Sequence, residues 1–477
     1  MKLKLAQQGK KRRLFGTDGI RGIANQYPMD GATALRVGQA IGAVLREMPG
    51  LDQVVVGKDT RLSGYVIETA LTSGICSMGM NVMLVGPLPT PGIAFIANSM
   101  RAKGGAMVSA SHNPIEYNGI KLFDSAGFKL SDDVELRVEE LLFGKELDDM
   151  RVPPHLMGKA YRIDDASGRY IQYLKGTFPS ELTLEGLKIV IDCANGAGYR
   201  VAPMMLRELG AEVISTCVSP NGININKDCG ALHPHRMARM VRENKADLGI
   251  ALDGDADRVI MCDEYGNLVD GDAILAICAT HLHERGLLSK ATVVGTNMTN
   301  LALELLLKER GIKLIRTDVG DRYVMEVMRR EGYTLGGETC GHIIFLQHTT
   351  CGDGILAALR VLAVMCQERQ SLADVAGLFV PFPQLIKNIH VRTRMPFDEI
   401  PGFNREIKDL EKELGGKGRY LVRYSGTENI ARVMIEAEDE QKVEILVDRL
   451  ASFIEDKIGM KETPPGEVIE AFPHYPG

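Results

Sequence analysis

A short apolar strand pattern occurs three times along this chain, and it constrains the fold more than any other feature. Continuous apolar runs of this length suit strands buried on both faces, as in a parallel sheet. Each run is followed by a helical pattern that ends at a glycine, the usual residue after a helix C-terminus, and then by a second strand. The first strands span residues 54–57, 189–192 and 292–295, the glycines are Gly79, Gly210 and Gly311, and the second strands span 82–85, 213–215 and 313–316.

The repeated units predict an α/β fold with three related domains. Strand–helix–strand units joined by short loops give right-handed crossovers and parallel or mixed sheets. Each unit continues into a third strand that runs into a polar loop, at residues 109–114, 253–258 and 336–342. Loops at the carboxyl ends of parallel strands build the sites of such sheets. We therefore expect the three loops to meet at one cleft.

The C-terminal part differs and predicts a smaller α+β domain. We expect strands at about 385–395, 420–424 and 431–437, and helices at 406–414 and 443–453. A length of 477 residues with 45% apolar content is enough for several domain cores. The predicted organisation is four domains and a loose tail, at residues 1–160, 161–262, 263–378, 379–462 and 463–477.

Composition argues against several classes of partner and compartment. The net charge of −6 and the absence of tryptophan argue against nucleic-acid binding. No apolar stretch reaches the ~18 residues of a transmembrane helix, and the N-terminus lacks the apolar centre of a signal peptide. Nine scattered cysteines without a Cys-x-x-Cys pair indicate reduced thiols. We expect a cytoplasmic protein with no membrane partner.

The first polar loop contains Ser111, followed by His112, Asn113 and Pro114. A serine where a strand breaks into a loop is expected to be exposed, and it can act as a nucleophile or carry a phosphate. His112 need not be its base, because adjacent side chains usually diverge. An ordinary Ser/Asn/Pro turn has the same composition, so this loop alone does not decide the function.

The second loop places Asp253, Asp255 and Asp257 in alternation after an apolar strand. Alternation lets the carboxylates converge on a hard cation, and crowding them without one would raise their pKa values. An EF-hand is excluded, because Arg258 stands where that motif needs glycine and the flanks are strands. Mg²⁺ fits, since it takes few carboxylates and completes its shell with phosphate oxygens. A solvated acidic turn is the alternative.

The third loop and a C-terminal hairpin supply groups suited to a phosphosugar. Glu338 can accept hydrogen bonds from hydroxyls, and His342 can handle protons or phosphate. An ordinary glycine-rich turn, or a hairpin with surface arginines, would explain either segment alone. Taken together, the four segments predict a phosphotransferase acting on a phosphosugar. The hairpin residues form a candidate anion nest: Arg423, Ser425, Gly426, Thr427 and Arg432.

The chain resembles the α-D-phosphohexomutases over about residues 13–457. The resemblance rests on these four segments and on the opening run Leu-Phe-Gly-Thr-Asp-Gly-Ile-Arg-Gly at residues 14–22, which follow one another in the order found in that family. The resemblance implies three related α/β domains and a smaller fourth around a central cleft. It also implies an isomerase that interconverts glucosamine 6-phosphate and glucosamine 1-phosphate, which would feed UDP-N-acetylglucosamine and cell-wall precursor synthesis. Mannose and glucose phosphates are the alternative substrates. A phosphosugar-binding protein without activity and a metal-dependent phosphatase are alternatives from other classes.

The resemblance also implies roles for individual residues. Ser111 would be carried as phosphoserine, and with the three aspartates it would hold one Mg²⁺ per subunit. A glucosamine or glucose 1,6-bisphosphate would be intermediate and activator, and a homodimer is compatible with the family. The hairpin residues would clamp the phosphate that does not react. The catalytic candidates are Arg21, Lys121, His112 and His342, and those near the sugar are Arg258, Asp321, Glu338 and Cys340.

Three positions depart from the family pattern. Ala256 replaces a glycine between the second and third aspartates, which is tolerated unless the position needs positive φ. Cys340 replaces a serine in the sugar loop, and a thiol is a weak hydrogen-bond partner. Asn429 replaces a proline after Glu428, which would loosen the phosphate loop. In addition, Arg322 is expected to offset part of the charge of Asp321.

Overall fold

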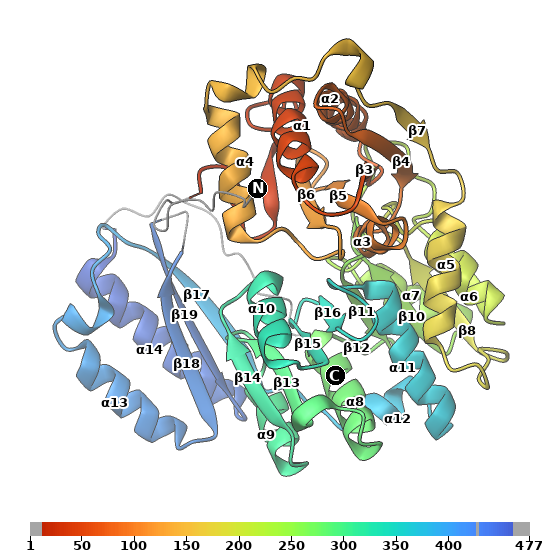
Figure 1. Cartoon of the computed structure of the whole chain (residues 1–477). Coiled ribbons are helices and arrows are strands. Elements are labelled where there is room, and N and C mark those ends of the chain that lie inside the picture. Colours follow the sequence, from red (N-terminus) through yellow and green to blue (C-terminus); the bar gives the residue numbers. More distant parts are fainter. Residues whose placement is uncertain (1–11, 426–428, 461–477) are drawn as a thin grey trace. The chain divides into compact units, whose positions relative to one another are not determined.

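The computed structural model describes residues 12–425 and 429–460 of the chain (Figure 1). The contacts divide the chain into two compact units. The first unit extends to Met298 and includes Arg310–Leu378, and the second comprises Thr299–Glu309 and the chain from Phe379 onward. The predicted α/β class is confirmed, because three mixed sheets with flanking helices make up the first unit.

The N-terminal sheet has seven strands in the order β1-β2-β6-β5-β3-β4-β7. Strands β5, β3, β4 and β7 are mutually parallel, whereas β6, β2 and β1 continue the sheet antiparallel. The strands are β1 (Phe15–Gly16), β2 (Gly19–Ile23), β3 (Leu51–Lys58), β4 (Asn81–Pro87), β5 (Ala102–Val108), β6 (Tyr117–Asp124) and β7 (Ala160–Arg162).

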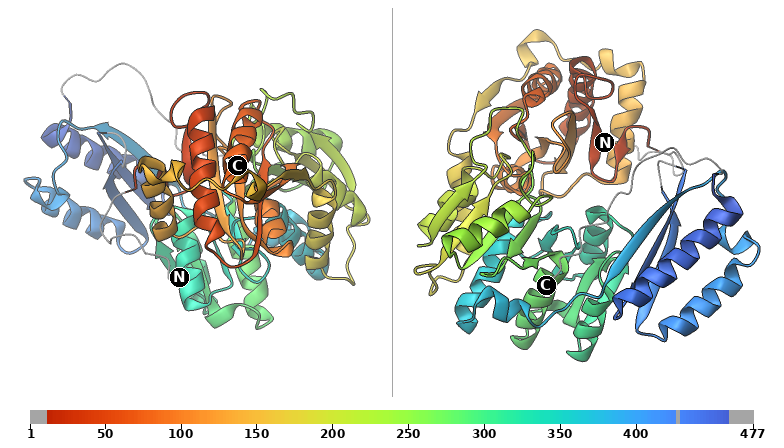
Figure 2. Two further views of the ribbon diagram at one scale, coloured as in Figure 1. Left: turned by 45° about the horizontal axis from the view of Figure 1, so that its top comes forward. Right: turned by 180° about the vertical axis from the view of Figure 1, so that it is seen from behind.

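Helices cover both faces of this sheet (Figures 1 and 2). Val54 and Val56 of β3 pack into the core formed by α1, α2 and α4. The next residues along the strand face the other way, where a Cβ on Gly57 would lie 2.3 Å from Ile93 of α3. Asp30 begins α1 by accepting a hydrogen bond from Thr33 N, as N-cap aspartates do. The helices are α1 (Gly31–Arg46), α2 (Ser63–Ser77), α3 (Thr90–Ser99), α4 (Asp132–Phe143) and α5 (Ala166–Thr177).

The second and third sheets repeat the central part of the first. In each sheet a middle strand, β8 or β13, pairs in parallel with a neighbour on either side. One of these neighbours, β10 or β15, continues into an antiparallel hairpin with the next strand, β11 or β16. The second sheet holds β8 (Lys188–Asp192), β9 (Glu212–Thr216), β10 (Leu248–Leu252), β11 (Val259–Cys262) and β12 (Leu268–Val269), with α6 (Val201–Glu208) and α7 (His235–Asn244). The third holds β13 (Thr292–Thr296), β14 (Lys313–Thr317), β15 (Leu335–Gly337) and β16 (Ile343–Phe345), with α8 (Gly271–Glu284), α10 (Asp321–Glu331), α11 (Gly354–Glu368) and α12 (Leu372–Ala376).

The second unit is an antiparallel sheet in the order β17-β19-β18 with helices packed on it (Figure 2). Its core joins Val433 and Ile435 of β19 to Leu410 of α13 and Leu450 of α14. The elements are β17 (Gln384–His390), β18 (Gly418–Tyr424), β19 (Ile430–Ala437), α13 (Phe403–Leu414) and α14 (Glu440–Ile458), together with α9 (Leu301–Glu309). The predicted tail at 463–477 lies outside the described residues. Among the described helices of both units, none has the length and apolar character needed to cross a bilayer.

Candidate active site

Three hairpin loops, one from each sheet of the first unit, converge on one site. They connect β5 to β6, β10 to β11 and β15 to β16, which are equivalent positions of the repeat. Hydrogen bonds join them: Val259 N, at the start of β11, donates to Gly341 O at 3.1 Å, and the Ser111 hydroxyl donates to Asp253 Oδ2 at 2.5 Å. The third sheet contributes a shorter loop than predicted, because Gly336 and Gly337 belong to β15.

Ser111 lies at the centre of these loops and is fully buried, so the prediction of an exposed serine is wrong. Its hydroxyl donates to Asp253 Oδ2 at 2.5 Å and lies 3.3 Å from His112 Nδ1. The residue has φ of +52°, a left-handed conformation that non-glycine residues rarely adopt. Neighbouring elements therefore determine where the hydroxyl points.

A buried ion pair that we did not predict holds the serine loop in place. Arg61 and Asp59 are both fully buried, and Arg61 Nε donates to Asp59 Oδ2 at 2.8 Å. The remaining guanidinium nitrogens donate to backbone carbonyls of the loop, those of Ser111, Asn113, Pro114 and Tyr117. The available signal was a charged Asp-Thr-Arg run directly after the apolar strand β3.

The three aspartates of the second loop are buried together. One oxygen of each lies within 4.8 Å of the others. Burial, followed by the charges of Asp257 and Asp255, raises the pKa of Asp253 well above its ordinary value. Burial would also raise the pKa of Asp257, but Lys121, His342 and Arg258 outweigh it and hold that pKa well below the ordinary range.

Lys121 is the internal counter-ion of this cluster. Its buried Nζ lies 2.8 Å from Asp255 Oδ2, 2.9 Å from Asp257 Oδ2 and 3.1 Å from Asp18 Oδ2. Burial lowers its pKa, but Asp18, Asp255 and Asp257 outweigh this effect, so its pKa is raised and it is protonated. Asp18, from the opening motif, also forms an ion pair with Arg21.

A second lysine extends the network. Lys129 Nζ lies 2.5 Å from both Asp18 Oδ1 and Asp321 Oδ2, and it was not predicted as a site residue. It balances Asp321 where Arg322 was expected to do so. That expectation about Arg322 is wrong, because its guanidinium bonds to Glu135 instead, with Nη2 2.5 Å from Oε1.

The donor set suits a hard divalent cation. Among the described residues, Asp255 Oδ1 and Asp257 Oδ1 are buried without a hydrogen-bond partner. Three carboxylates meet here, and Lys121 forms ion pairs with two of them, Asp255 and Asp257. Oxygen-only ligands of this kind are typical of Mg²⁺ sites that share a phosphate.

The two candidate histidines are in opposite protonation states. Burial, then the charges of Arg258 and Arg21, lowers the pKa of His112 to about 3, so it is neutral. Burial would also lower the pKa of His342, but Asp321 and Asp257 outweigh it and raise that pKa well above its ordinary value. His342 Nε2 lies 3.3 Å from Asp321 Oδ2 and Nδ1 lies 3.7 Å from Asp257 Oδ1. Gly352 N also lies 3.1 Å from Nε2, and the two carboxylates outweigh this unfavourable N–H contact in the protonated ring.

The other predicted sugar-loop residues lie beside this network. Glu338 is buried, accepts from Gly320 N at 3.0 Å on Oε1, and has a pKa raised by burial. Burial raises the pKa of the Cys340 thiol, which keeps it neutral. Burial would lower the pKa of Arg258, but the nearby carboxylates of Asp257, Asp253 and Glu338 outweigh it and raise that pKa. Arg258 Nε lies 3.9 Å from Asp257 Oδ1.

Ala256 occupies a position that does need positive φ. Its φ is +57° and its side chain is fully buried. An L-residue with a Cβ pays about 1–2 kcal/mol in this conformation relative to glycine. The substitution is therefore accommodated with strain in the loop between Asp255 and Asp257.

The predicted phosphate residues of the second unit lie at one end of a hairpin. Arg423 on β18 and Arg432 on β19 are directly opposite each other, and Ser425 N donates to Ile430 O at 2.8 Å. Burial, then the charge of Arg432, lowers the pKa of Arg423. Arg432 Nε is buried and has no hydrogen-bond partner among the described residues. Gly426 and Thr427 lie outside the described residues.

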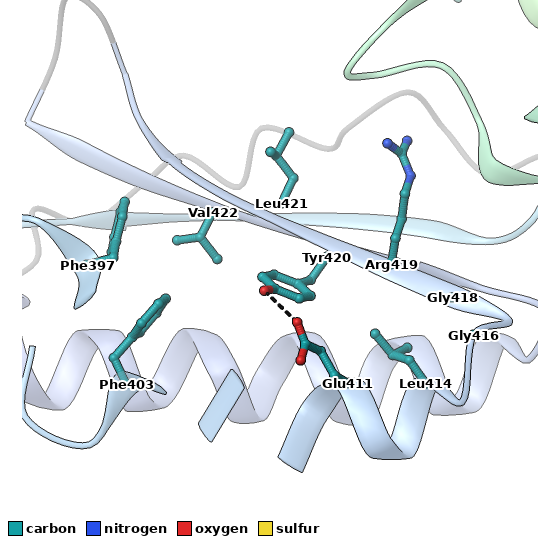
Figure 3. A pocket seen from close by; sticks show the side chains of 10 residues that line it. All are labelled: Phe397, Phe403, Glu411, Leu414, Gly416, Gly418, Arg419, Tyr420, Leu421 and Val422. Atoms are coloured by element: carbon teal, nitrogen blue, oxygen red, sulfur yellow. Dashed lines mark hydrogen bonds between the residues drawn. The ribbon is translucent and has the colours of Figure 1, made fainter. Parts of the chain in front are cut away.

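A pocket of about 620 Å³ lies between α13 and β18 in the same unit (Figure 3). Apolar side chains such as Phe397, Phe403 and Leu414 make up much of its lining, and Tyr420 bonds to Glu411 inside it. It contains none of the predicted phosphate residues, so it is separate from the hairpin end that carries Arg423.

Four family descriptions match successive parts of the chain. They are phosphoglucomutase/phosphomannomutase alpha/beta/alpha domain I at residues 12–148, domain II at 168–266, domain III at 270–382 and the C-terminal domain at 364–453.

Curated relatives match over nearly their full length. A phosphoglucosamine mutase of Geobacter sp. (strain M21) is 54% identical over 94% of this chain and 99% of its own, and one of Anaeromyxobacter dehalogenans is 54% identical over 94% and 100%. Among solved structures, a phosphoglucomutase/phosphomannomutase family protein from Burkholderia thailandensis has a TM-score of 0.76 at 22% identity, covering 93% of this chain and 99% of its own. The Aspergillus fumigatus N-acetylphosphoglucosamine mutase in complex with GlcNAc-6P and magnesium has a TM-score of 0.63 at 19% identity, covering 94% and 96%.

Proposed function

The chain belongs to the phosphoglucomutase/phosphomannomutase family, and from this premise we propose that it interconverts glucosamine 6-phosphate and glucosamine 1-phosphate. The observation that carries the proposed chemistry is the Ser111 hydroxyl, 2.5 Å from Asp253 at the meeting point of three equivalent loops. The proposed substrate is supported by the curated relatives, phosphoglucosamine mutases that are more than half identical to this chain.

Ser111 is carried as phosphoserine in the active enzyme. Its phosphoryl group passes to the free hydroxyl of the sugar phosphate, so the phosphorus–oxygen bond to serine breaks as one to the sugar forms. The sugar hydroxyl gives up its proton, and the serine oxygen gains one. The resulting 1,6-bisphosphate turns over and returns its other phosphate to Ser111, which completes the isomerisation.

The surrounding charges favour this transfer. Asp253, Asp255 and Asp257 would hold Mg²⁺, which supplies positive charge beside the transferring group. Lys121 and His342 have raised pKa values, so both are positively charged and can stabilise negative charge on the transferring group. They are also the candidates for proton transfer with the serine oxygen. Positioned charge of this kind is the main source of catalysis in phosphoryl transfer.

The remaining groups select and hold the substrate. Glu338 accepts hydrogen bonds from sugar hydroxyls, with Arg258, Asp321 and Cys340 nearby. Cys340 is a weak partner as a neutral thiol. Arg423, Ser425 and Arg432, with Gly426 and Thr427, hold the phosphate that does not react, because two facing arginines need an anion between them.

Turnover on three hexose 1-phosphates tests this function. We expect kcat/KM for glucosamine 1-phosphate to exceed that for glucose 1-phosphate by about 100- to 1,000-fold. This ratio is below the discrimination of about 10⁴–10⁵ that a site can reach against an analogue that lacks a required hydrogen-bonding group. Intact mass of the purified enzyme should show one phosphate on Ser111. A preference for mannose 1-phosphate, or stoichiometric release of inorganic phosphate, would contradict the proposal.

A further inference from the structure

A second cluster of metal-ligating side chains lies in the second sheet, outside the site described above. Asp192 ends β8, Cys217 directly follows β9, and Cys229 lies in the long loop that leads to α7. One ligand atom of each lies within 4.8 Å of the other two. Strands β8 and β9 are parallel neighbours with Asp192 opposite Thr216, so their carboxyl ends bring the first two residues to one edge.

Backbone hydrogen bonds fix the third residue against this edge. Asn195 N donates to Cys217 O at 2.7 Å, and Asn226 N donates to Ala194 O at 2.9 Å. Two residues after Cys229, Ala231 N donates to Leu252 O at 3.0 Å. These bonds attach the loop to the strand ends on both sides of Cys229, at Asn226 and at Ala231. The protein alone therefore holds the three ligating residues in place.

Asp192 is the observation that points to a ligand. Its side chain is fully buried, and Oδ1 accepts from Ala194 N at 2.8 Å. The second oxygen, Oδ2, is buried and makes no hydrogen bond that meets the usual geometry with any described residue, although the Cys217 thiol interacts with the carboxylate group. Leaving a buried polar atom unsatisfied is unfavourable, and such atoms in native proteins often indicate an ion or water. A cation between this oxygen and the two thiols would remove that cost.

The two cysteines of the cluster can each offer a thiol to a metal. Cys229 is buried and Cys217 is half-buried, which leaves one side of the cluster accessible. The thiolate is the form of cysteine that binds metals.

We propose that Asp192, Cys217 and Cys229 bind one thiophilic divalent cation of the Zn²⁺ class, with a fourth coordination position left open. Two thiolate sulfurs are the soft donors that Zn²⁺ binds, and Zn²⁺ also accepts a carboxylate oxygen, whereas the aspartate cluster at Ser111 offers only hard oxygen. The two sites thus select different metals by ligand chemistry.

The proposed ion would also brace the serine loop. Asn226 belongs to the same long loop as Cys229, and its Nδ2 donates to Ser111 O at 2.8 Å and to Asn113 O at 3.0 Å. An ion that ties this loop to the ends of β8 and β9 restricts the segment that positions the serine backbone. The residues that bind it are positioning residues and not catalytic ones.

Cobalt binding to the reduced, full-length protein tests the site. With Mg²⁺ in excess, we expect one equivalent of Co²⁺ to produce a thiolate-to-cobalt charge-transfer band that Zn²⁺ abolishes. Cys217→Ser and Cys229→Ser should each weaken Co²⁺ binding by more than about 100-fold, since even ligand-orienting neighbours cost 10–100-fold. Cys366→Ala, at a half-buried cysteine outside the cluster, should retain the band, as should Asp255→Asn.

Circular dichroism establishes that each variant is folded, and Cys217→Ser, at the half-buried position, decides the test if Cys229→Ser does not fold. The proposal is overturned if the wild-type protein shows no band at one equivalent, or if Cys217→Ser retains it. It is also overturned if the protein prepared without reductant has lost two hydrogens to a Cys217–Cys229 disulfide and the reduced form binds no Co²⁺. Loss of the band in Asp255→Asn alone would assign the ion to the aspartate cluster.

Discussion

The serine-centred site of the first unit and the arginine hairpin of the second concentrate charge in opposite ways. In the first, Lys121 and Lys129 are shared among buried carboxylates, so that most charges have a partner within about 3 Å. In the hairpin, Arg423 directly faces Arg432, and within the part of the chain that the structure describes Arg432 Nε is buried without a hydrogen-bond partner. Like charges directly opposite in a sheet destabilise it.

The difference shows what each site needs from a ligand. The serine-centred site has cationic partners for most of its carboxylates and needs a cation only at the aspartate oxygens that lack partners, whereas the hairpin stays electrostatically unfavourable until an anion arrives. A substitution in the first site should therefore affect chemistry and stability together. A substitution in the hairpin should weaken binding and leave stability equal or improved.

The largest effect is expected at Ser111. Ser111→Ala removes the phosphate carrier, so turnover should fall by more than about a thousandfold, the scale seen when a nucleophile is removed. Substrate binding should persist, since the hairpin and sugar loop are unchanged. Steady-state assays, isothermal titration and intact mass would measure these properties. Near wild-type turnover of the variant would exclude the phosphoserine mechanism.

Removing one carboxylate tests the metal role. Asp255→Asn removes a charge with little change in shape and leaves Lys121 with one partner fewer. Mg²⁺ affinity and turnover should fall together by about 100-fold, and higher Mg²⁺ should restore part of the rate. Asp165→Asn, at an exposed aspartate of the same unit, is the control. Wild-type activity that survives thorough chelation would contradict the role.

Arg423→Ala tests the opposite kind of site. A charged hydrogen bond contributes about 1.5–3 kcal/mol, so substrate binding or turnover should weaken by roughly 10- to 150-fold. The midpoint of urea unfolding should stay equal or rise, because the repulsion with Arg432 is removed. Arg449→Ala, which breaks ion pairs with Glu406 and Glu413, should leave binding unchanged. An unaltered affinity for the sugar phosphate in Arg423→Ala would refute the clamp.

His112 gives a pH-dependent effect of intermediate size. Its pKa is about 3 when folded, against about 6.5 when unfolded. The unfolded state therefore binds more protons between these values, so stability falls as pH drops from 6.5 toward 3. Between pH 7.5 and pH 5, wild type should lose about 1–2 kcal/mol of unfolding free energy more than His112→Gln. Parallel losses in both proteins would show that His112 is not held neutral.

The smallest effect is expected at Ala256. Ala256→Gly removes a Cβ from a left-handed backbone, and the free energy of unfolding should rise by about 1 kcal/mol. Thermal unfolding measures this gain. A decrease would mean that packing of the buried methyl group outweighs the strain. An unchanged Mg²⁺ affinity would indicate that neighbouring elements, and not residue 256, determine the loop shape.

The repeat and the acidic loop could be predicted from the sequence because their signals are local. Apolar runs of strand length and glycines after helices specify the three sheets through short-range sterics and burial. Alternating aspartates after a buried strand indicate a cation site because their spacing in the sequence is enough to bring the carboxylates together. The sequence alone therefore determined the fold class and the segments that build the site.

Only the tertiary structure decided which side chains meet across those segments. Lys129, Arg61 and Asn226 contact the serine loop or its network through pairs far apart in the chain, and no local pattern distinguishes such partners from solvated charges. The burial of Ser111 could not be predicted either, because residues from the second-sheet part of the chain, such as Asp253 and Asn226, pack against it. The cluster of Asp192, Cys217 and Cys229 likewise exists only because parallel pairing of β8 and β9 aligns their ends and backbone hydrogen bonds return a long loop to them.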